Sequence, residues 1–222
     1  VESGLVRGNP AARLLEGEFA YERWEMTTRF QTGELFFAEF LITNLGIGDR
    51  NAALVGHIIG PGERSRKFRT GRREKRWHLS NDRLRVEVGR SWLDQRGLKN
   101  SVRIEKKRVR VGLDYYRGGD ASWSTDFAPA GYAIDLLDPA AQTEGTLWVE
   151  GMAVPVGVKG SMAVTHSWAE TAESNLLARQ FEFFTLPNEQ DKPAIYLADL
   201  LQKGGARSNW LVARIGSETI WE

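Results

Sequence analysis

Two stretches of the sequence carry residue types suited to acid–base chemistry. MAVTHSWAE (162–170) places a histidine two positions before a tryptophan, and YERWEM (21–26) places two glutamates around a tryptophan. On a β-strand, residues two apart share a face, so His166 and Trp168 would point the same way. An imidazole beside an aromatic ring can hold an apolar ligand or, when cationic, protonate an alkene. A Glu25 facing a barrel interior could have a raised pKa and act as an acid. His166 and Glu25 are therefore the candidate catalytic residues.

Each of these residues also has a plainer interpretation. A histidine and a tryptophan two positions apart fit ordinary packing between sheets equally well, and a solvated outer face is the commoner place for a residue such as Glu25. Gly56 beside His57 indicates a close backbone approach or a bulge, with His57 either a satisfied core residue or a ligand contact.

Signatures of other chemistry are missing from the sequence. It contains no cysteine, which excludes thiolate catalysis, disulfides and cysteine-based metal sites. We find no GxSxG, Walker A, GxGxxG or HExxH motif. The three histidines, His57, His78 and His166, lie far apart and have no metal-ligand spacing. We therefore expect no metal ion and no other cofactor.

The elements that must position these residues have period two almost throughout. Aromatic and β-branched runs alternate with turn-formers such as QTG (31–33) and GIGDRN (46–51), which indicates hairpins. The pattern predicts an all-β protein: an antiparallel lipocalin-like β-barrel or a strongly curved sandwich with short helices only. The expected strands are 18–29, 34–44, 52–59, 83–88, 101–105, 108–115, 132–137, 145–150, 154–158, 161–168, 179–186, 194–201 and 209–215.

The domain organisation follows from length and from the position of the first strand. We treat residues 1–16 as an N-terminal extension and 17–222 as one barrel domain, since all-β domains often reach this size. The best helical candidate, 170–178, is short. Residues 116–139 are less regular: RGGDASWSTDFAPAG (117–131) is expected to form a long loop before the strand at 132–137, and a barrel mouth could use its Trp123, Asp126 and Phe127.

The charge of the chain is unevenly distributed. The formal net charge is +1, but residues 64–110 hold 18 Lys and Arg against 5 Asp and Glu. This excess indicates either an anionic partner, such as a membrane surface, or the solvated faces of amphipathic strands, which are commoner. No window approaches the roughly 18 apolar residues of a spanning helix. The start at Val1 indicates a processed or trimmed product and leaves the compartment open between cytoplasm and periplasm.

The order of several segments resembles a known superfamily. YERWE (21–25) is followed by the Phe-rich ELFFAEFLITN (34–44), the glycine-containing VGVKGSMAVTHSW (156–168) and the aromatic ARQFEFFTL (178–186). Together they resemble the double-lipocalin superfamily of carotenoid 1,2-hydratase (hydroxyneurosporene synthase), the AttH-type proteins and the fungal survival factors. The resemblance covers about residues 17–215. It implies that this chain supplies mainly the N-terminal barrel, with a second lipocalin-like domain or another copy as partner.

The sequence departs from the hydratase pattern at two places. The hydratases share a His/Trp segment ahead of the glycine-containing strand and a Tyr-x-Asp on that strand. Here the first region reads GYAIDLLDP (131–139), and Met162 and Val164 occupy the Tyr and Asp positions. The resemblance therefore does not imply carotenoid hydration by that mechanism, although His166 lies a little downstream.

We expect the protein to bind an apolar small molecule, a lipid or an isoprenoid, in a barrel cavity. One alternative is an enzyme of the same fold, a hydratase, isomerase or cyclase acting on an alkene or polyene, with aromatic rings stabilising a developing cation. Another is a module that binds an anionic surface through residues 64–110; nucleic acid is not favoured as the partner. We expect most of the ligand-binding candidates to lie on the inner face of the barrel, although an error of one residue in the strand register would move them to the outer face. These candidates are Trp24, Phe36, Phe40, His57, Trp123, Trp148, Trp168, Phe181 and Phe183.

Overall fold

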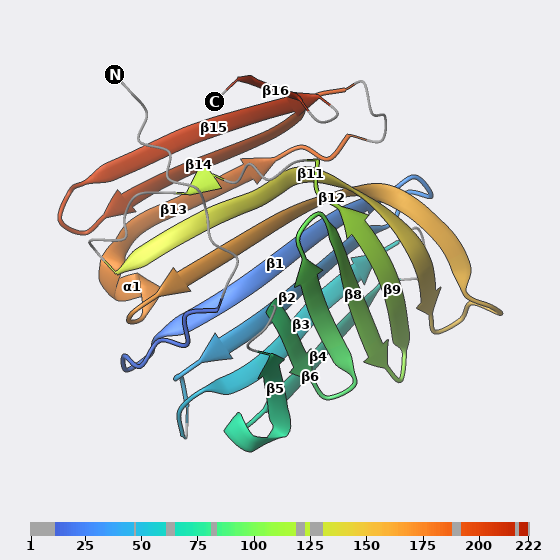
Figure 1. Cartoon of the computed structure of the whole chain (residues 1–222), viewed down its shortest axis with the longest axis horizontal. Coiled ribbons are helices and arrows are strands. Elements are labelled where there is room, and N and C mark those ends of the chain that lie inside the picture. The colour runs from blue at the N-terminus through green and yellow to red at the C-terminus, as the bar shows by residue number, and fades with distance from the viewer. Residues whose placement is uncertain are drawn as a thin grey trace.

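The computed structural model describes residues 12–46, 48–60, 65–80, 84–118, 123–124, 131–187, 192–215 and 218–221. Nearly all of its regular structure is antiparallel β-strand, so the predicted all-β, lipocalin-like fold class is confirmed (Figure 1). The expected helix at 170–178 is reduced to one turn, α1 (Glu173–Leu176). A short 3-10 turn, η1 (Glu74–Arg76), lies between two strands. Within the described part of the chain, no helix has the length and apolar character needed to cross a membrane.

The first and larger sheet contains the strands of the N-terminal three-quarters of the chain. Its strand order is β4-β3-β2-β1-β12-β11-β9-β8-β7-β6-β5, and β10 pairs with β11. The sheet curls until β4 and β3 contact β6, which nearly closes a barrel. Its strands are β1 (Tyr21–Phe30), β2 (Leu35–Thr43), β3 (Asn51–Ile59), β4 (Arg66–Arg72), β5 (Trp77–Ser80), β6 (Leu84–Val88), β7 (Ser91–Arg96), β8 (Lys99–Lys106), β9 (Val109–Tyr116), β10 (Trp123–Ser124), β11 (Tyr132–Val149) and β12 (Val156–Ala169).

Two long strands give the sheet its curvature. The segments 132–137 and 145–150, expected as two strands, form one strand, β11. The segments 154–158 and 161–168, also expected as two strands, form one strand, β12. The register between β11 and β12 shifts on either side of Asp138, and such bulges bend a strand and increase its twist. Pro139, which cannot donate a ladder hydrogen bond, lies in this irregular part. Glycine is also required at position 160 of β12, because a Cβ at that position would lie 2.1 Å from the carbonyl oxygen of Arg29 on β1.

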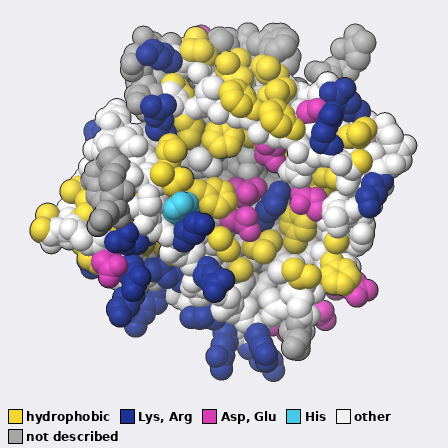
Figure 2. Space-filling view, turned by 180° about the vertical axis from the view of Figure 1, so that it is seen from behind, with side chains coloured by type: hydrophobic (Ala, Val, Ile, Leu, Met, Phe, Trp, Pro, Cys, Tyr) yellow, Lys and Arg dark blue, Asp and Glu magenta, His cyan; other side chains and the backbone are white. Residues whose placement is uncertain are grey.

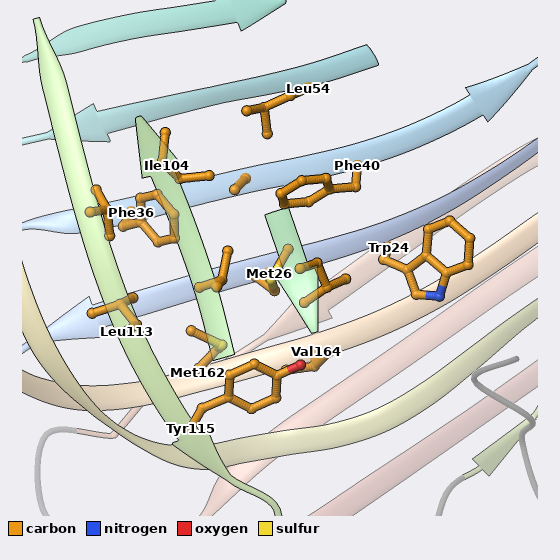
Figure 3. Packing of buried hydrophobic residues seen from close by; sticks show 14 of the residues in the cluster. Trp24, Met26, Phe36, Phe40, Leu54, Ile104, Leu113, Tyr115, Met162 and Val164 are labelled. Atoms are coloured by element: carbon orange, nitrogen blue, oxygen red, sulfur yellow. The ribbon is translucent and has the colours of Figure 1, made fainter. Parts of the chain in front are cut away.

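The inner face of this sheet is filled with apolar side chains. Trp24, Phe36 and Phe40 are fully buried there, as their strand pattern predicts. Figure 3 shows these side chains meeting others from strands on the opposite wall, including Ile104 and Leu113. The interior is therefore a packed hydrophobic core over this region.

The second sheet lies against the outer face of β1, β11 and β12 (Figure 1). It contains β13 (Leu177–Phe184), β14 (Ala194–Gln202), β15 (Arg207–Ile215) and β16 (Glu218–Trp221). One apolar cluster joins Leu200 to Ile134, and another joins Tyr196 and Val212 to Leu136. The outer face of these central strands is consequently buried as well as the inner one.

A buried ion pair fixes the second sheet in place. Arg214 Nη2 lies 2.7 Å from Asp138 Oδ1 and also donates to the carbonyl oxygen of Ala140 at 3.2 Å. Asp138 further accepts the backbone N–H groups of Gly118 and Ala140 at 2.9 and 2.8 Å. The bulge of β11 thus presents a carboxylate to the last strands of the chain.

We predict that Arg214→Met lowers the free energy of unfolding by about 3 kcal/mol, because removing one partner leaves the other charge buried and uncompensated. Arg179→Met is the matched control, since Arg179 pairs with Asp199 at 2.8 Å on the surface and should have a much smaller effect. Urea unfolding of both variants measures the difference. Equal losses in the two variants would contradict the role given to the buried pair.

Candidate functional site

The charged residues of strand β1 lie in two different sites. Its burial alternates along the whole strand, so Glu22 and Trp24 face the barrel interior while Arg23 and Glu25 face outward. The pairing of β1 with β12 sets Trp24 opposite His166 and Glu25 opposite Thr165. The two candidate catalytic residues therefore lie on opposite faces of one sheet and cannot share a site.

The inner site is a sealed cluster around His166. Its Nε2 lies 2.9 Å from Glu22 Oε1, and its Nδ1 lies 3.4 Å from Asp135 Oδ2. Trp24 stacks on the imidazole with ring centroids 5.0 Å apart. All four side chains are buried. Trp168 shares this inner face, so the predicted common orientation of His166 and Trp168 is confirmed.

The end of the N-terminal extension closes this cluster. Both carboxylate oxygens of Glu22 accept the backbone N–H of Arg13 at 2.9 Å, and Oε2 also accepts that of Leu14 at 3.2 Å. The Arg13 guanidinium lies over the Trp168 ring, 4.2 Å from its centroid. Glu22 is thus fully hydrogen-bonded, and the inner cluster ties the extension to the barrel.

The electrostatic interactions of His166 are those expected of a residue with a structural role. Burial alone would lower the pKa of His166, but the interactions with Asp135 and Glu22 outweigh it and raise that pKa above its usual value. The His166 ring is held between these two carboxyl groups with no access to solvent. A proton on His166 has no described pocket into which it can be delivered.

The outer site is a polar cluster beneath the second sheet. Arg23 Nε lies 3.2 Å from Glu25 Oε2 and donates to Ser167 Oγ at 2.8 Å. Arg23 Nη2 reaches Glu173 Oε1 of α1 at 3.4 Å. The hydroxyls of Tyr21 and Tyr132 donate to the same Glu173 oxygen, at 2.7 and 3.2 Å.

A pocket of about 400 Å³ opens onto this cluster. That volume is within the range of small-molecule sites. Polar groups line part of the pocket, and aromatic and small apolar groups line the rest. Figure 2 shows a hollow in which acidic side chains gather between hydrophobic ones. The lining residues are Arg23, Glu25, Thr27, Phe37, Ala163, Thr165, Glu182, Phe184 and Tyr196.

Glu25 is the group in this pocket that can exchange a proton near neutral pH. Burial raises its pKa to about 7, since the loss of water outweighs the opposing charge of Arg23. The negative charges of Glu39, Glu182 and Glu173 raise it further. A carboxyl group with this pKa is present in both protonation states at pH 7 and can act as an acid or a base.

The second sheet contributes the other polar groups of the pocket. The hydroxyl of Tyr196 donates to Glu182 Oε2, and Gln180 donates to Glu182 Oε1 at 2.6 Å. Burial and the Glu182 charge raise the pKa of Tyr196 well above its usual value, so it stays a neutral donor. Phe184 stacks on Tyr196 at 6.4 Å and supplies an aromatic wall.

A larger pocket on the outer face has a different character. It measures about 750 Å³ and is lined partly by Arg103, Asp114, Glu144 and Lys159. Its charges are paired with one another: Arg103 lies 2.8 Å from Asp114, and Lys159 lies 3.9 Å from Glu144. Burial opposes the shift, but hydrogen bonds from Arg103 and Ser101 hold the pKa of Asp114 below its usual value. The Asp114 carboxyl group is therefore a poor proton donor.

Several ligand-binding candidates do not face the barrel interior. Trp148 lies on the outer face of β11. Phe181 and Phe183 are 48% and 46% exposed, on the side of β13 opposite Glu182. The expectation that these three point inward is wrong, because Leu147 and Val149 take the inward positions beside Trp148 and because β13 belongs to the second sheet. Whether any candidate contacts a ligand stays a prediction.

Two further candidates lie outside the core. His57 is on the outer face of β3, with Gly56 inward, where a Cβ would lie 2.1 Å from the Phe68 ring. The close approach at Gly56 is thus explained by packing. Trp123 is buried beside Leu136 and the second sheet. Asp126 and Phe127 are outside the described residues.

The sequence reasoning missed most of the pocket lining, including Glu182 and Tyr196. One signal was available: Glu182 is a carboxylate inside an otherwise aromatic run, ARQFEFFTL. Among the described residues, no group of three or more His, Asp or Glu side chains is placed to hold a metal ion.

Comparisons with known proteins identify the fold. No protein-family model matches the sequence, and no curated protein matches it. The structure is similar to that of an AttH-type protein from Nitrosomonas europaea, with a TM-score of 0.62 and 15% identity, over 98% of this chain and 73% of the other. It is also similar to kievitone hydratase from Nectria haematococca, with a TM-score of 0.61 and 16% identity, over 96% of this chain and 69% of the other. The chain therefore shares the lipocalin-like fold of these two structures, as the resemblance in its sequence predicted.

Proposed function

We propose that the protein is an acid–base enzyme that binds a small, largely apolar, unsaturated molecule in the pocket between the two sheets. The observation that carries the proposal is Glu25, a carboxyl group with a pKa of about 7 on the wall of a 400 Å³ pocket. The apolar part of the lining, Phe37, Ala163 and Phe184, suits a hydrophobic substrate. Hydration of a double bond is the reaction class we favour, and the fold shared with kievitone hydratase supports it.

The proposed reaction adds water across a carbon–carbon double bond. Neutral Glu25 gives its proton to one alkene carbon, and the π electrons form the new C–H bond, leaving a cation on the other carbon. The aromatic faces of Phe184 and Tyr196 stabilise this cation. Water attacks the cation and gives a proton to the Glu25 carboxylate, which restores the acid. Glu182, held by Tyr196 and Gln180, is placed to orient that water.

The barrel interior is a weaker site for a ligand than this pocket. Its inward side chains, among them Trp24, Phe36 and Phe40, are fully buried against one another. Binding of an apolar molecule without turnover is the second candidate function, and it uses the same pocket between the sheets. The two functions differ in whether Glu25 is needed for more than binding.

Glu25→Gln should lower turnover by about 100-fold or more while leaving substrate affinity within a few-fold, since a general acid contributes about 10²–10⁴ in rate. The assay incubates kievitone and a panel of simpler alkenes in H₂¹⁸O and detects the labelled alcohol by mass spectrometry. Binding of these alkenes without any labelled product in the wild type would favour the binding function. Full activity in the variant would contradict the role of Glu25.

The pH dependence of turnover should follow the protonation of Glu25. Because the acid form is required, the rate should fall as pH rises through about 7. Glu39 lies opposite Glu25 on β2 and raises its pKa without lining the pocket. Glu39→Gln removes that negative charge, so the fall should move to lower pH while the maximal rate is kept. A pH profile that is identical in this variant would contradict the assignment.

Filling the pocket should block binding directly. Ala163 lines it and lies opposite Thr27, so Ala163→Phe should weaken the binding of Nile red, a neutral apolar probe, at least tenfold. Thr146→Phe is the control, because Thr146 lies on the outer face in the charged pocket. Fluorescence titration measures both, and little salt dependence is expected. Similar binding by the two variants would place the probe elsewhere.

A further inference from the structure

The outer face of β2, β3 and β4 forms a continuous surface that starts at the pocket. Phe37, which lines the pocket, is paired with His57 on β3, and His57 is paired with Lys67 on β4. Neighbouring strands lie about 4.8 Å apart, so Lys67 is within about 10 Å of the pocket wall. The second sheet covers the outer face of β1, β11 and β12 and leaves this surface open (Figure 1).

Aliphatic side chains occupy the middle of this surface. Leu35, Val55 and Ile59 are 40%, 42% and 47% exposed. Leu35 and Ile59 are directly paired across β2 and β3, and Val55 lies on the same face of β3. We call these three side chains, with His57 between Val55 and Ile59 on β3, the aliphatic band.

Basic side chains border the aliphatic band. Lys67 and Arg69 are exposed on the outer face of β4, directly beside His57 and Val55. Residues 65–80 hold seven Lys and Arg against one acidic residue, Glu74. Figure 2 shows Lys and Arg side chains gathered beside and below the acidic hollow.

We propose that this face docks on an anionic lipid bilayer and that the pocket takes its apolar substrate from that bilayer. The basic residues would meet the lipid headgroups, while Leu35, Val55 and Ile59 enter the boundary of the acyl region. Nucleic acid would use the charge but leaves the aliphatic band without a role, since bases stack on aromatic side chains. The uptake of substrate rests on the proposed function of the pocket, whereas the docking itself does not.

The test is sedimentation of the protein with vesicles of phosphatidylcholine alone and of phosphatidylcholine mixed with phosphatidylglycerol. The wild type should bind the anionic vesicles and release them as salt is raised. Each basic residue near such a surface contributes about a fivefold factor in affinity, so Lys67→Gln with Arg69→Gln should lower it at least tenfold. Val55→Ser with Ile59→Ser should also weaken binding, because the aliphatic contact is lost while the charge remains.

Matched controls separate docking from net charge and from the pocket chemistry. Lys99→Gln with Lys203→Gln removes the same charge from exposed positions elsewhere, the start of β8 and the turn after β14, and should leave vesicle binding unchanged. Glu25→Gln should bind vesicles like the wild type even where its turnover is lost. Equal binding to neutral and anionic vesicles, or retention on heparin without binding to vesicles, would overturn the proposal.

Discussion

The inner face of β1 is buried and most of its outer face is half-buried, so Glu22, Arg23 and Glu25 must find their partners with little access to water. The inner face is closed by the barrel core and by residues 12–16, and the outer face is covered by the second sheet. An unpaired carboxylate in such surroundings costs several kcal/mol and either acquires hydrogen bonds or takes up a proton. The strand contains one example of each solution.

Glu22 represents the first solution and Glu25 the second. Glu22 accepts two backbone N–H groups and contacts His166, which fixes the N-terminal extension over the barrel. Glu25 lies beside Arg23, but burial, together with the charges of neighbouring carboxylates, raises its pKa to about 7. Two carboxyl groups with different environments acquire different chemical roles, as they do in many active sites. The reaction that we propose for the pocket uses the carboxyl group whose charge is incompletely compensated.

The sequence was sufficient to predict the fold class and much of the strand pattern. Period two in β1 and β2 correctly placed Trp24, Phe36 and Phe40 in the core and set His166 and Trp168 on one face. The sequence singles out Glu25 as a carboxylate that would be costly to bury inside the barrel, whereas it faces outward and is half-buried beneath the second sheet.

The remainder depended on contacts between residues distant in sequence. Alternation defines two faces but does not say which is covered, so the second sheet and its Glu182 and Tyr196 could not be brought to Glu25 in advance. Trp148 faces outward because Leu147 and Val149, its neighbours on β11, take the inner positions, which alternation alone does not decide. The same packing sealed His166 in a structural cluster, although its residue type and neighbours suggested chemistry.

The most direct test of this account is the titration of Glu25 itself. NMR of side-chain carboxyl carbons as a function of pH, with the resonance assigned by its loss in Glu25→Gln, reports the pKa of that group. The account predicts a midpoint near 7 in the folded protein. A midpoint near the ordinary glutamate value of about 4.3 would mean that the pocket holds no acid at neutral pH and would contradict the proposed function.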